Sequence, residues 1–305
     1  MSGATQPNGQ PLALAAASNG SITVQDPGEV TLNLVWSLVY DIPSGNFVMV
    51  NEGSLSSGTP MVLALTNTGG GTSALRLSSF LLAGLPPGST WDVAPGGAAL
   101  AVRPTLSSSI NLNVEGSGPY QPGNPVIAYD GWGGGQPNEI WTFNPLDSGG
   151  FPWNYAFTPE CNQSTFLTAN PDDPGGQLTI QPPAGTDVRP APTQLWSAEY
   201  RIDGIIPLGA VFINEELSMA LRTTPGGGAV FCADPSKIDA WSAWTVGPGP
   251  DAGGSVIYSA GKAQLVLNVS GGGPYNPGNV VISYPWQGGA ENEQWIPLFV
   301  PHEVT

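Results

Sequence analysis

The sequence predicts an all-β chain of two tandem domains, each made of three repeats of about 50 residues. Three observations support this prediction. No stretch shows sustained helical periodicity. Glycine and proline contribute 42 and 32 of the 305 residues and cluster between short alternating segments, as turn residues do between strands. Tryptophans recur at intervals of about 50 residues, which indicates an internal repeat: Trp36, Trp91, Trp141, Trp196, Trp244 and Trp295.

The second half of the chain duplicates the first. Residues 48–52 (Val-Met-Val-Asn-Glu) match residues 211–215 (Val-Phe-Ile-Asn-Glu), and residues 91–96 match residues 244–249. The six repeats therefore group as three plus three. We place the two domains at residues 1–149 and 150–305, each of a usual domain size.

Short alternating segments predict the strands, which in chain order are residues 47–51, 61–65, 110–114, 210–214, 219–223 and 265–269. In the last of these, Leu265, Leu267 and Val269 share one face, and Val266 and Asn268 share the other. Glycine-rich triplets between the segments suit tight turns with positive φ. Closure of the sheets would remove exposed edges, and each repeat tryptophan is expected to fill the core.

The charge of the chain excludes several classes of partner. The formal net charge is −16, from 23 acidic residues against seven basic ones that are scattered along the chain. Because phosphate-binding surfaces need clustered Lys and Arg, we expect neither nucleic acid nor an anionic membrane as a partner. No apolar run could cross a bilayer, and residues 1–6 show no secretory signal. We therefore expect a cytoplasmic chain, or one released by a route that needs no classical signal.

The residues that usually carry nucleophilic catalysis are scarce. His302, the single histidine, lies three residues from the end, and no serine or cysteine motif accompanies it. Residues 170–174 (Asn-Pro-Asp-Asp-Pro) lack the alternating ligands of a calcium loop and predict a solvated turn. Cys161 and Cys232 are expected to be free thiols, with a single bridge as the alternative. We expect a protein that is not an enzyme and uses no cofactor.

The last repeats of the two halves are the most alike. Residues 118–124 (Gly-Pro-Tyr-Gln-Pro-Gly-Asn) match residues 273–279 (Gly-Pro-Tyr-Asn-Pro-Gly-Asn), and both repeats end in Asn-Glu-x-Trp, at residues 138–141 and 292–295. Residues 194–196 read Gln-Leu-Trp. This pattern resembles the ricin B-type lectin family, whose repeat ends in Gln-x-Trp. The resemblance spans essentially the whole chain and is most specific in the repeats that end at Trp141 and Trp295.

The resemblance implies that each half is a β-trefoil, in which six strands close a barrel and six cap it. It also implies that the chain is a carbohydrate-binding lectin for galactose- or N-acetylgalactosamine-type glycans. In such a site an aromatic ring stacks on the sugar, and polar side chains from a strand and from the residue before Gln-x-Trp fix its hydroxyls. By matching position, the first site comprises Asn113, Tyr129, Trp132, Asn138 and Glu139. The second comprises Asn268, Tyr284, Trp286, Gln287, Asn292 and Glu293.

Two departures from the family pattern bear on these sites. The strand aspartate of the family is asparagine in both copies, and the glutamine is glutamate in both copies. Our hypothesis is that Asn113 with Glu139, and Asn268 with Glu293, form hydrogen-bonded amide–carboxylate pairs with the partners exchanged. Tyr129 and Tyr284 could either stack on a ligand or lie in the core.

Besides a hydrolase with a site built from loop carboxylates, which the missing motifs disfavour, two alternatives to sugar binding stay open. The loops of the last repeats, which are alike in the two halves, could simply build stable hairpins. A trefoil that has lost sugar binding could instead act as a protein-binding or inhibitor module. In either case we expect a monomer or a homodimer.

Overall fold

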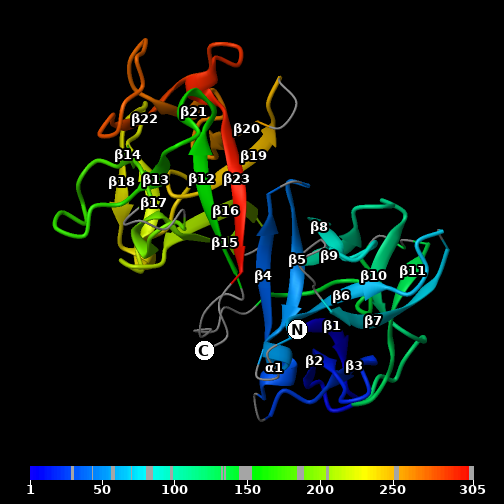
Figure 1. Ribbon diagram of the computed structural model, residues 1–305. Helices are drawn as coiled ribbons and strands as arrows, with labels where there is room; N and C mark the ends of the chain where they lie inside the picture. The colour runs from blue at the N-terminus through cyan, green and yellow to red at the C-terminus, as the bar shows by residue number, and fades with distance from the viewer. Residues whose placement is uncertain are drawn as a thin grey trace. The chain divides into compact units, whose positions relative to one another are not determined.

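Figure 1 shows the computed structural model of the chain. It describes residues 1–28, 31–42, 44–55, 59–69, 71–79, 85–96, 99–131, 133, 135–143, 153–183, 189–203, 206–250 and 254–301. The chain divides into two compact units. The described residues of 1–152 and 202–207 form unit 1, and those of 153–201 and 208–303 form unit 2. The boundary expected at residues 149 and 150 lies outside the described residues.

Unit 2 contains a barrel of six strands (Figure 1): β12 (Trp153–Pro159), β15 (Trp196–Asp203), β16 (Ile206–Asn214), β19 (Trp244–Pro248), β20 (Ser255–Ser259) and β23 (Trp295–Pro301). The pairing follows that order and returns from β23 to β12. The β12–β23 ladder runs from Trp153↔Pro301 to Pro159↔Trp295. Because the first strand pairs with the last, the sheet closes and the edges of an open sheet are removed.

Three hairpins cap the barrel of unit 2. They are β13 (Phe166–Thr168) with β14 (Thr179–Gln181), β17 (Ala220–Thr223) with β18 (Gly228–Ala233), and β21 (Leu265–Val269) with β22 (Val281–Pro285). Each repeat therefore contributes two barrel strands and one hairpin between them. Three such repeats around a closed barrel make unit 2 a β-trefoil.

Unit 1 repeats the arrangement. Its hairpins are β2 (Pro11–Ala16) with β3 (Ile22–Gln25), β6 (Met61–Leu65) with β7 (Ser73–Ser79), and β10 (Ile110–Val114) with β11 (Val126–Asp130). Its other strands are β1 (Ser2–Thr5), β4 (Trp36–Asp41), β5 (Asn46–Asn51), β8 (Thr90–Pro95) and β9 (Leu100–Pro104). Trp141 takes the twelfth place through bridges to Ser2 and Leu100. Unit 1 is a second β-trefoil.

Helical structure in the described residues is confined to short segments. These are α1 (Glu52–Leu55) and the 3-10 turns η1 (Leu32–Leu34), η2 (Glu160–Asn162), η3 (Pro192–Gln194), η4 (Pro235–Lys237) and η5 (Glu291–Glu293). None of these described helices has the length and apolar character that a membrane crossing requires.

One hydrogen bond recurs in all six repeats. The indole N–H of each repeat tryptophan donates to the carbonyl of a leucine in the first strand of its own hairpin, at 2.9–3.2 Å. The acceptors are Leu14, Leu63, Leu112, Leu167, Leu221 and Leu267. A buried indole needs such a partner, so the bond fixes each hairpin on the barrel. Five of these tryptophans are at most 3% exposed, whereas Trp36 is only half-buried, contrary to the expectation of six core residues.

The expected strands are confirmed, with bounds that differ by a residue or, for β16, by four at its start. Asn113 is 5% exposed and Asn268 is 4% exposed, although each lies on the face of its strand opposite to the leucines. This face of each hairpin is therefore covered at its asparagine, and the residues around the asparagine form the site described below.

The two cysteines are free thiols, as expected. Burial raises the pKa of Cys161 from 9.0 to about 11 and that of Cys232 from 9.0 to about 12. Because the thiolate is the reactive form, both should label with a disulfide reagent far more slowly than an unfolded thiol at pH 8.5. This protection is present below pH 9 and is lost as the pH rises through the folded values. Labelling rates in native buffer and in urea, measured from pH 8 to 11, test this; equal rates in the two conditions would contradict it.

Candidate functional site

The recurring tryptophan bond defines equivalent positions in the six repeats. The residue after the acceptor leucine stands in the middle of the hairpin's first strand, and the residue three places before the tryptophan lies in the turn that enters the barrel. The first position holds, in chain order, Ala15, Ala64, Asn113, Thr168, Arg222 and Asn268. The second holds Asn33, Gly88, Asn138, Thr193, Trp241 and Asn292. Only the last repeat of each trefoil has asparagine at both positions.

These two asparagines contact each other in both trefoils. Asn138 Nδ2 donates to Asn113 Oδ1 at 2.9 Å and to the Val114 carbonyl at 3.2 Å. In unit 2, Asn292 Nδ2 donates to Asn268 Oδ1 at 3.0 Å and to the Val269 carbonyl at 2.9 Å. Because the same bonds form twice, the asparagine pair is a built feature of the last repeat.

Each pair keeps two hydrogen-bonding groups unused. Within the described part of the chain, no group accepts from Asn113 Nδ2 or donates to Asn138 Oδ1, and the same holds for Asn268 Nδ2 and Asn292 Oδ1. None of these atoms is completely shielded from solvent. Each pair therefore offers one donor and one acceptor to a ligand or to water.

An exposed tyrosine lies beside each asparagine pair. Asn113 is opposite Ile127 in the β10–β11 ladder and Asn111 is opposite Tyr129, so Tyr129 shares the face of Asn113. Tyr129 is 42% exposed, so its ring does not lie in the core.

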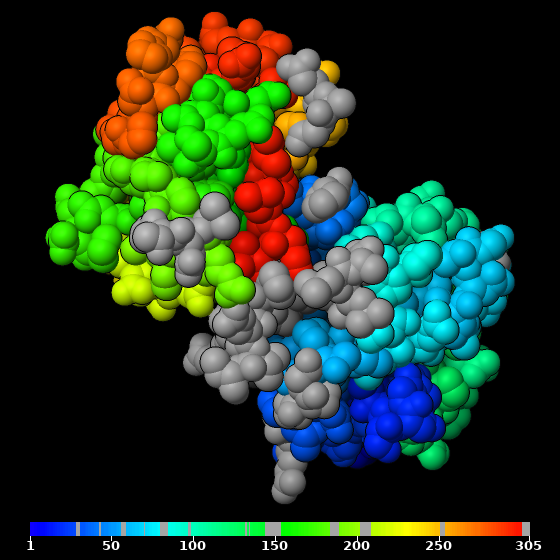
Figure 2. Space-filling view, viewed as in Figure 1, coloured from blue at the N-terminus to red at the C-terminus, as the bar shows by residue number. Residues whose placement is uncertain are grey.

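The same geometry holds in unit 2. Asn268 is opposite Ile282 and Val266 is opposite Tyr284, which is 48% exposed. Figure 2 shows the β21–β22 hairpin, coloured orange, at the surface in this view. The equivalent positions of the other four hairpins, read from their ladders, are Gln25, Ser78, Gln181 and Ala233. An aromatic ring stands at this position only in the last repeats.

The hypothesis that Glu139 and Glu293 bond to the strand asparagines is wrong. Glu139 is 4% exposed, and its carboxylate accepts from the backbone N–H groups of Gly133, at 3.0 and 3.2 Å, and Gln136, at 3.2 Å. A carboxylate is an acceptor with several lone pairs, so a glycine-rich loop full of N–H donors outcompetes a single side-chain amide.

Glu293 does the same in unit 2. It is fully buried and accepts from the N–H groups of Gln287 at 2.9 Å, Gly289 at 3.2 Å and Ala290 at 3.3 Å. Gly289 has φ +99°, and a Cβ there would lie 2.2 Å from Pro250 Cγ, so only glycine fits this turn. The glutamates therefore hold the loop that borders the site and do not face a ligand.

The loop that Glu293 holds carries the remaining candidates of unit 2. Trp286 is half-buried, with its ring centroid 6.1 Å from that of Tyr258, and its backbone N–H donates to the Gln264 carbonyl. Gln287 is exposed, and its side chain donates to the Pro285 carbonyl at 3.0 Å. The corresponding Trp132 of unit 1 lies outside the described residues. Tyr258 was not among the sequence candidates, because it belongs to a barrel strand rather than to the hairpin.

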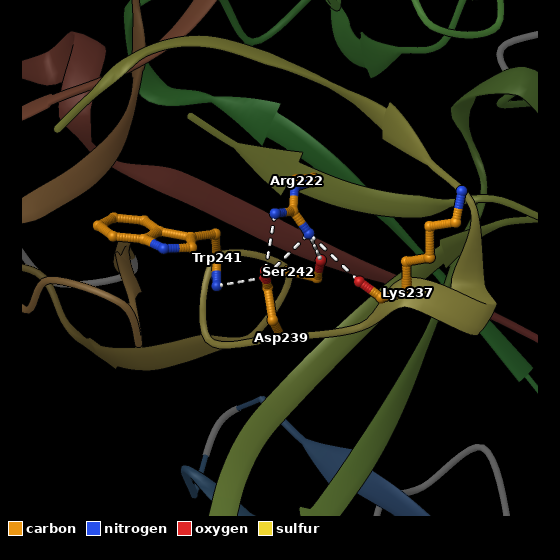
Figure 3. A network of polar contacts seen from close by, with 5 residues as sticks. All are labelled: Arg222, Lys237, Asp239, Trp241 and Ser242. Carbon is orange, nitrogen blue, oxygen red and sulfur yellow. Dashed lines mark hydrogen bonds and ion pairs between the residues drawn. The ribbon is translucent and has the colours of Figure 1, made fainter. Parts of the chain in front are cut away.

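The equivalent place in the middle repeat of unit 2 is filled by an ion pair (Figure 3). Arg222 stands at the position of Asn268 and binds Asp239 through both terminal nitrogens, at 2.9 and 2.7 Å. It also donates to Ser242 Oγ at 3.1 Å and to the Lys237 carbonyl at 3.3 Å. The guanidinium is thus engaged by groups of the protein, so this repeat lacks the unused donor and acceptor that the asparagine pairs have.

The first repeat of unit 2 is closed in a similar way. Gln194 is 1% exposed and donates to Thr168 Oγ1 at 3.1 Å and to the Pro182 carbonyl at 2.9 Å. The Gln-x-Trp motif itself therefore marks a structural contact here.

In residues 170–174, the Asn170 side chain accepts from the Asp172 N–H at 3.1 Å, which makes a turn. His302 lies outside the described residues.

No protein-family model matches the chain, and no curated protein sequence matches it. Among solved structures, the chain is similar to a mosquitocidal holotoxin (12% identity, TM-score 0.40), over 93% of this chain and 32% of that one. The chain thus spans about a third of that toxin. It is also similar to the Abrus precatorius agglutinin (15%, TM-score 0.35), over 94% of this chain and 93% of that one. A third likeness is to the Macrolepiota procera ricin B-like lectin in complex with lactose (16%, TM-score 0.37), over 50% and 98%.

Proposed function

We propose that this chain is a carbohydrate-binding lectin without catalytic activity, with one sugar-binding notch in the last repeat of each trefoil. The observation that supports the proposal is the asparagine pair with one unused donor and one unused acceptor beside an exposed tyrosine. It occurs twice, at equivalent positions of the two trefoils. We define the notches by these residues: notch 1 is Asn113, Asn138 and Tyr129, and notch 2 is Asn268, Asn292 and Tyr284.

The chemistry of the notch suits a sugar. A pyranose has a face of C–H groups, which packs on an aromatic ring, and a rim of hydroxyls, each of which both donates and accepts. Tyr284 supplies the ring, while Asn268 Nδ2 and Asn292 Oδ1 supply one donor and one acceptor. Galactose or N-acetylgalactosamine is the proposed class, carried over from the family resemblance.

Affinity for a single sugar should be weak. For an open notch with few polar contacts we expect a binding free energy of roughly 4–8 kcal/mol, which corresponds to a millimolar to micromolar dissociation constant. Two notches on one chain would raise the avidity for surfaces dense in glycans.

A glycan array with the full chain tests the proposed function. We expect binding to galactose- or N-acetylgalactosamine-terminated glycans and displacement by millimolar galactose. An array on which no glycan retains the protein would contradict the proposal.

The second candidate is a trefoil that has lost sugar binding and acts as a protein-binding or inhibitor module. One observation favours it: Asn138 Nδ2 is already engaged by Asn113 and by a backbone carbonyl, and neutral amides replace the carboxylate at the strand position. Neutral amides form weaker hydrogen bonds to hydroxyls than a carboxylate does. An empty glycan array is the result that this candidate predicts.

A further inference from the structure

The two notches differ in what lies next to them on the sheet. In unit 2, the cross-strand row that contains Tyr284 continues across β21 and β20, because Val266 is in register with both Tyr284 and Tyr258. Side chains in register across neighbouring antiparallel strands point to the same face. Tyr258, Val266 and Tyr284 therefore form one row on the face of notch 2.

This row offers two separate aromatic surfaces. Tyr284 is 48% exposed at one end, and at the other Tyr258 and Trp286 are half-buried with ring centroids 6.1 Å apart. Val266 lies between them, fully buried, as an apolar floor. Since neighbouring strands lie about 4.8 Å apart, the backbone positions of Tyr258 and Tyr284 are separated by about 10 Å. A disaccharide, whose full end-to-end length is similar, would reach from one aromatic surface to the other.

The same row in unit 1 is polar. Tyr258 pairs with Thr245, the residue after Trp244, and Arg103 pairs with Asp92, the residue after Trp91, so Arg103 takes the place of Tyr258. Asn111, opposite Tyr129, takes the place of Val266. Asn111 is fully buried, and among the described residues neither of its side-chain amide atoms has a hydrogen-bond partner. The floor of notch 1 is thus an amide where that of notch 2 is a valine.

We propose that notch 2 binds two linked sugar rings, one on Tyr284 and one on the Tyr258–Trp286 surface, whereas notch 1 binds a single terminal ring. This inference rests on the proposed function and adds the size of the ligand at each notch. The second ring would gain its affinity from the apolar face of a sugar packed on Tyr258 and Trp286. Among the described residues of unit 1, a guanidinium takes the place of Tyr258 and an amide that of Val266, and neither group is an apolar platform.

The experiment compares galactose with lactose, in which galactose is linked to a second ring. Notch 2 is isolated in an Asn113→Ala variant and notch 1 in an Asn268→Ala variant, and affinities are measured by NMR titration of the full chain. We expect lactose to bind notch 2 about tenfold more tightly than galactose, and the two sugars to bind notch 1 within about twofold of each other.

A second variant assigns the effect to the ring. Tyr258→Ala in the Asn113→Ala background should reduce the lactose-to-galactose affinity ratio from about ten to about one, while Tyr258→Phe should keep it. An equal ratio at both notches, or a ratio that Tyr258→Ala leaves unchanged, would overturn the inference and leave the proposed function standing. Failure of the wild-type chain to bind either sugar would overturn both.

Discussion

Truncation of Trp295 to alanine is expected to lower the free energy of unfolding of the second trefoil by about 3–5 kcal/mol. The ring is fully buried, and its indole N–H donates to the Leu267 carbonyl at 2.9 Å. The variant would lose the packing of a large side chain and leave that buried carbonyl without its donor. Because Leu267 neighbours Asn268, the hairpin that carries notch 2 should also loosen. Urea denaturation followed by circular dichroism measures the change.

Trp36→Ala is the matched control for this prediction. Trp36 makes the equivalent bond to the Leu14 carbonyl at 3.1 Å but is only half-buried. Its truncation should therefore cost roughly half as much, since the transfer contribution scales with buried area. Equal costs for the two variants, or a cost below about 1 kcal/mol for Trp295→Ala, would contradict the role of the buried tryptophans.

The second large effect is expected for the asparagine pairs. Asn268→Ala removes the free donor of notch 2 and the acceptor that holds the side chain of Asn292. Each buried hydrogen-bonding group left unsatisfied costs about 1–3 kcal/mol, so sugar affinity at notch 2 should fall about ten- to hundredfold. The double variant Asn113→Ala with Asn268→Ala should lose glycan binding altogether. Titration with galactose-terminated glycans measures both.

Thr168→Ala provides a control at the equivalent position of another repeat. Thr168 accepts from Gln194 and belongs to a closed contact, so this change should alter stability slightly and leave glycan binding as in the wild-type chain. If Thr168→Ala weakened binding as much as Asn268→Ala does, or if the double asparagine variant still bound, the assignment of the notches would be wrong.

The fold could be predicted from the sequence because one large residue marks every repeat. The tryptophans fall at a fixed structural place, where each indole reaches a leucine carbonyl of its own hairpin. Alternation then located strands such as residues 110–114 and 265–269, whose bounds the structure reproduces. The exposure of Trp36 could not be foreseen, because it depends on how much of the first repeat covers the ring.

The site was less predictable, for reasons of geometry that no spacing records. The sequence suggested that Glu293 would bond to Asn268, yet backbone N–H groups of residues 287–290 surround its carboxylate. Those N–H groups converge on the carboxylate only once the glycine-rich turn has formed. Tyr258 was missed because it reaches the notch by cross-strand register with Val266, a relation between residues of different strands.

The central claim is that each trefoil presents one sugar notch, formed in its last repeat, and a crystal soaked in galactose tests it most directly. We expect a sugar ring over Tyr129, with hydroxyls within hydrogen-bond distance of Asn113 and Asn138. We expect a second ring over Tyr284, with hydroxyls within hydrogen-bond distance of Asn268 and Asn292. Sugar bound only in other repeats, or both notches empty at concentrations that saturate binding in solution, would contradict it.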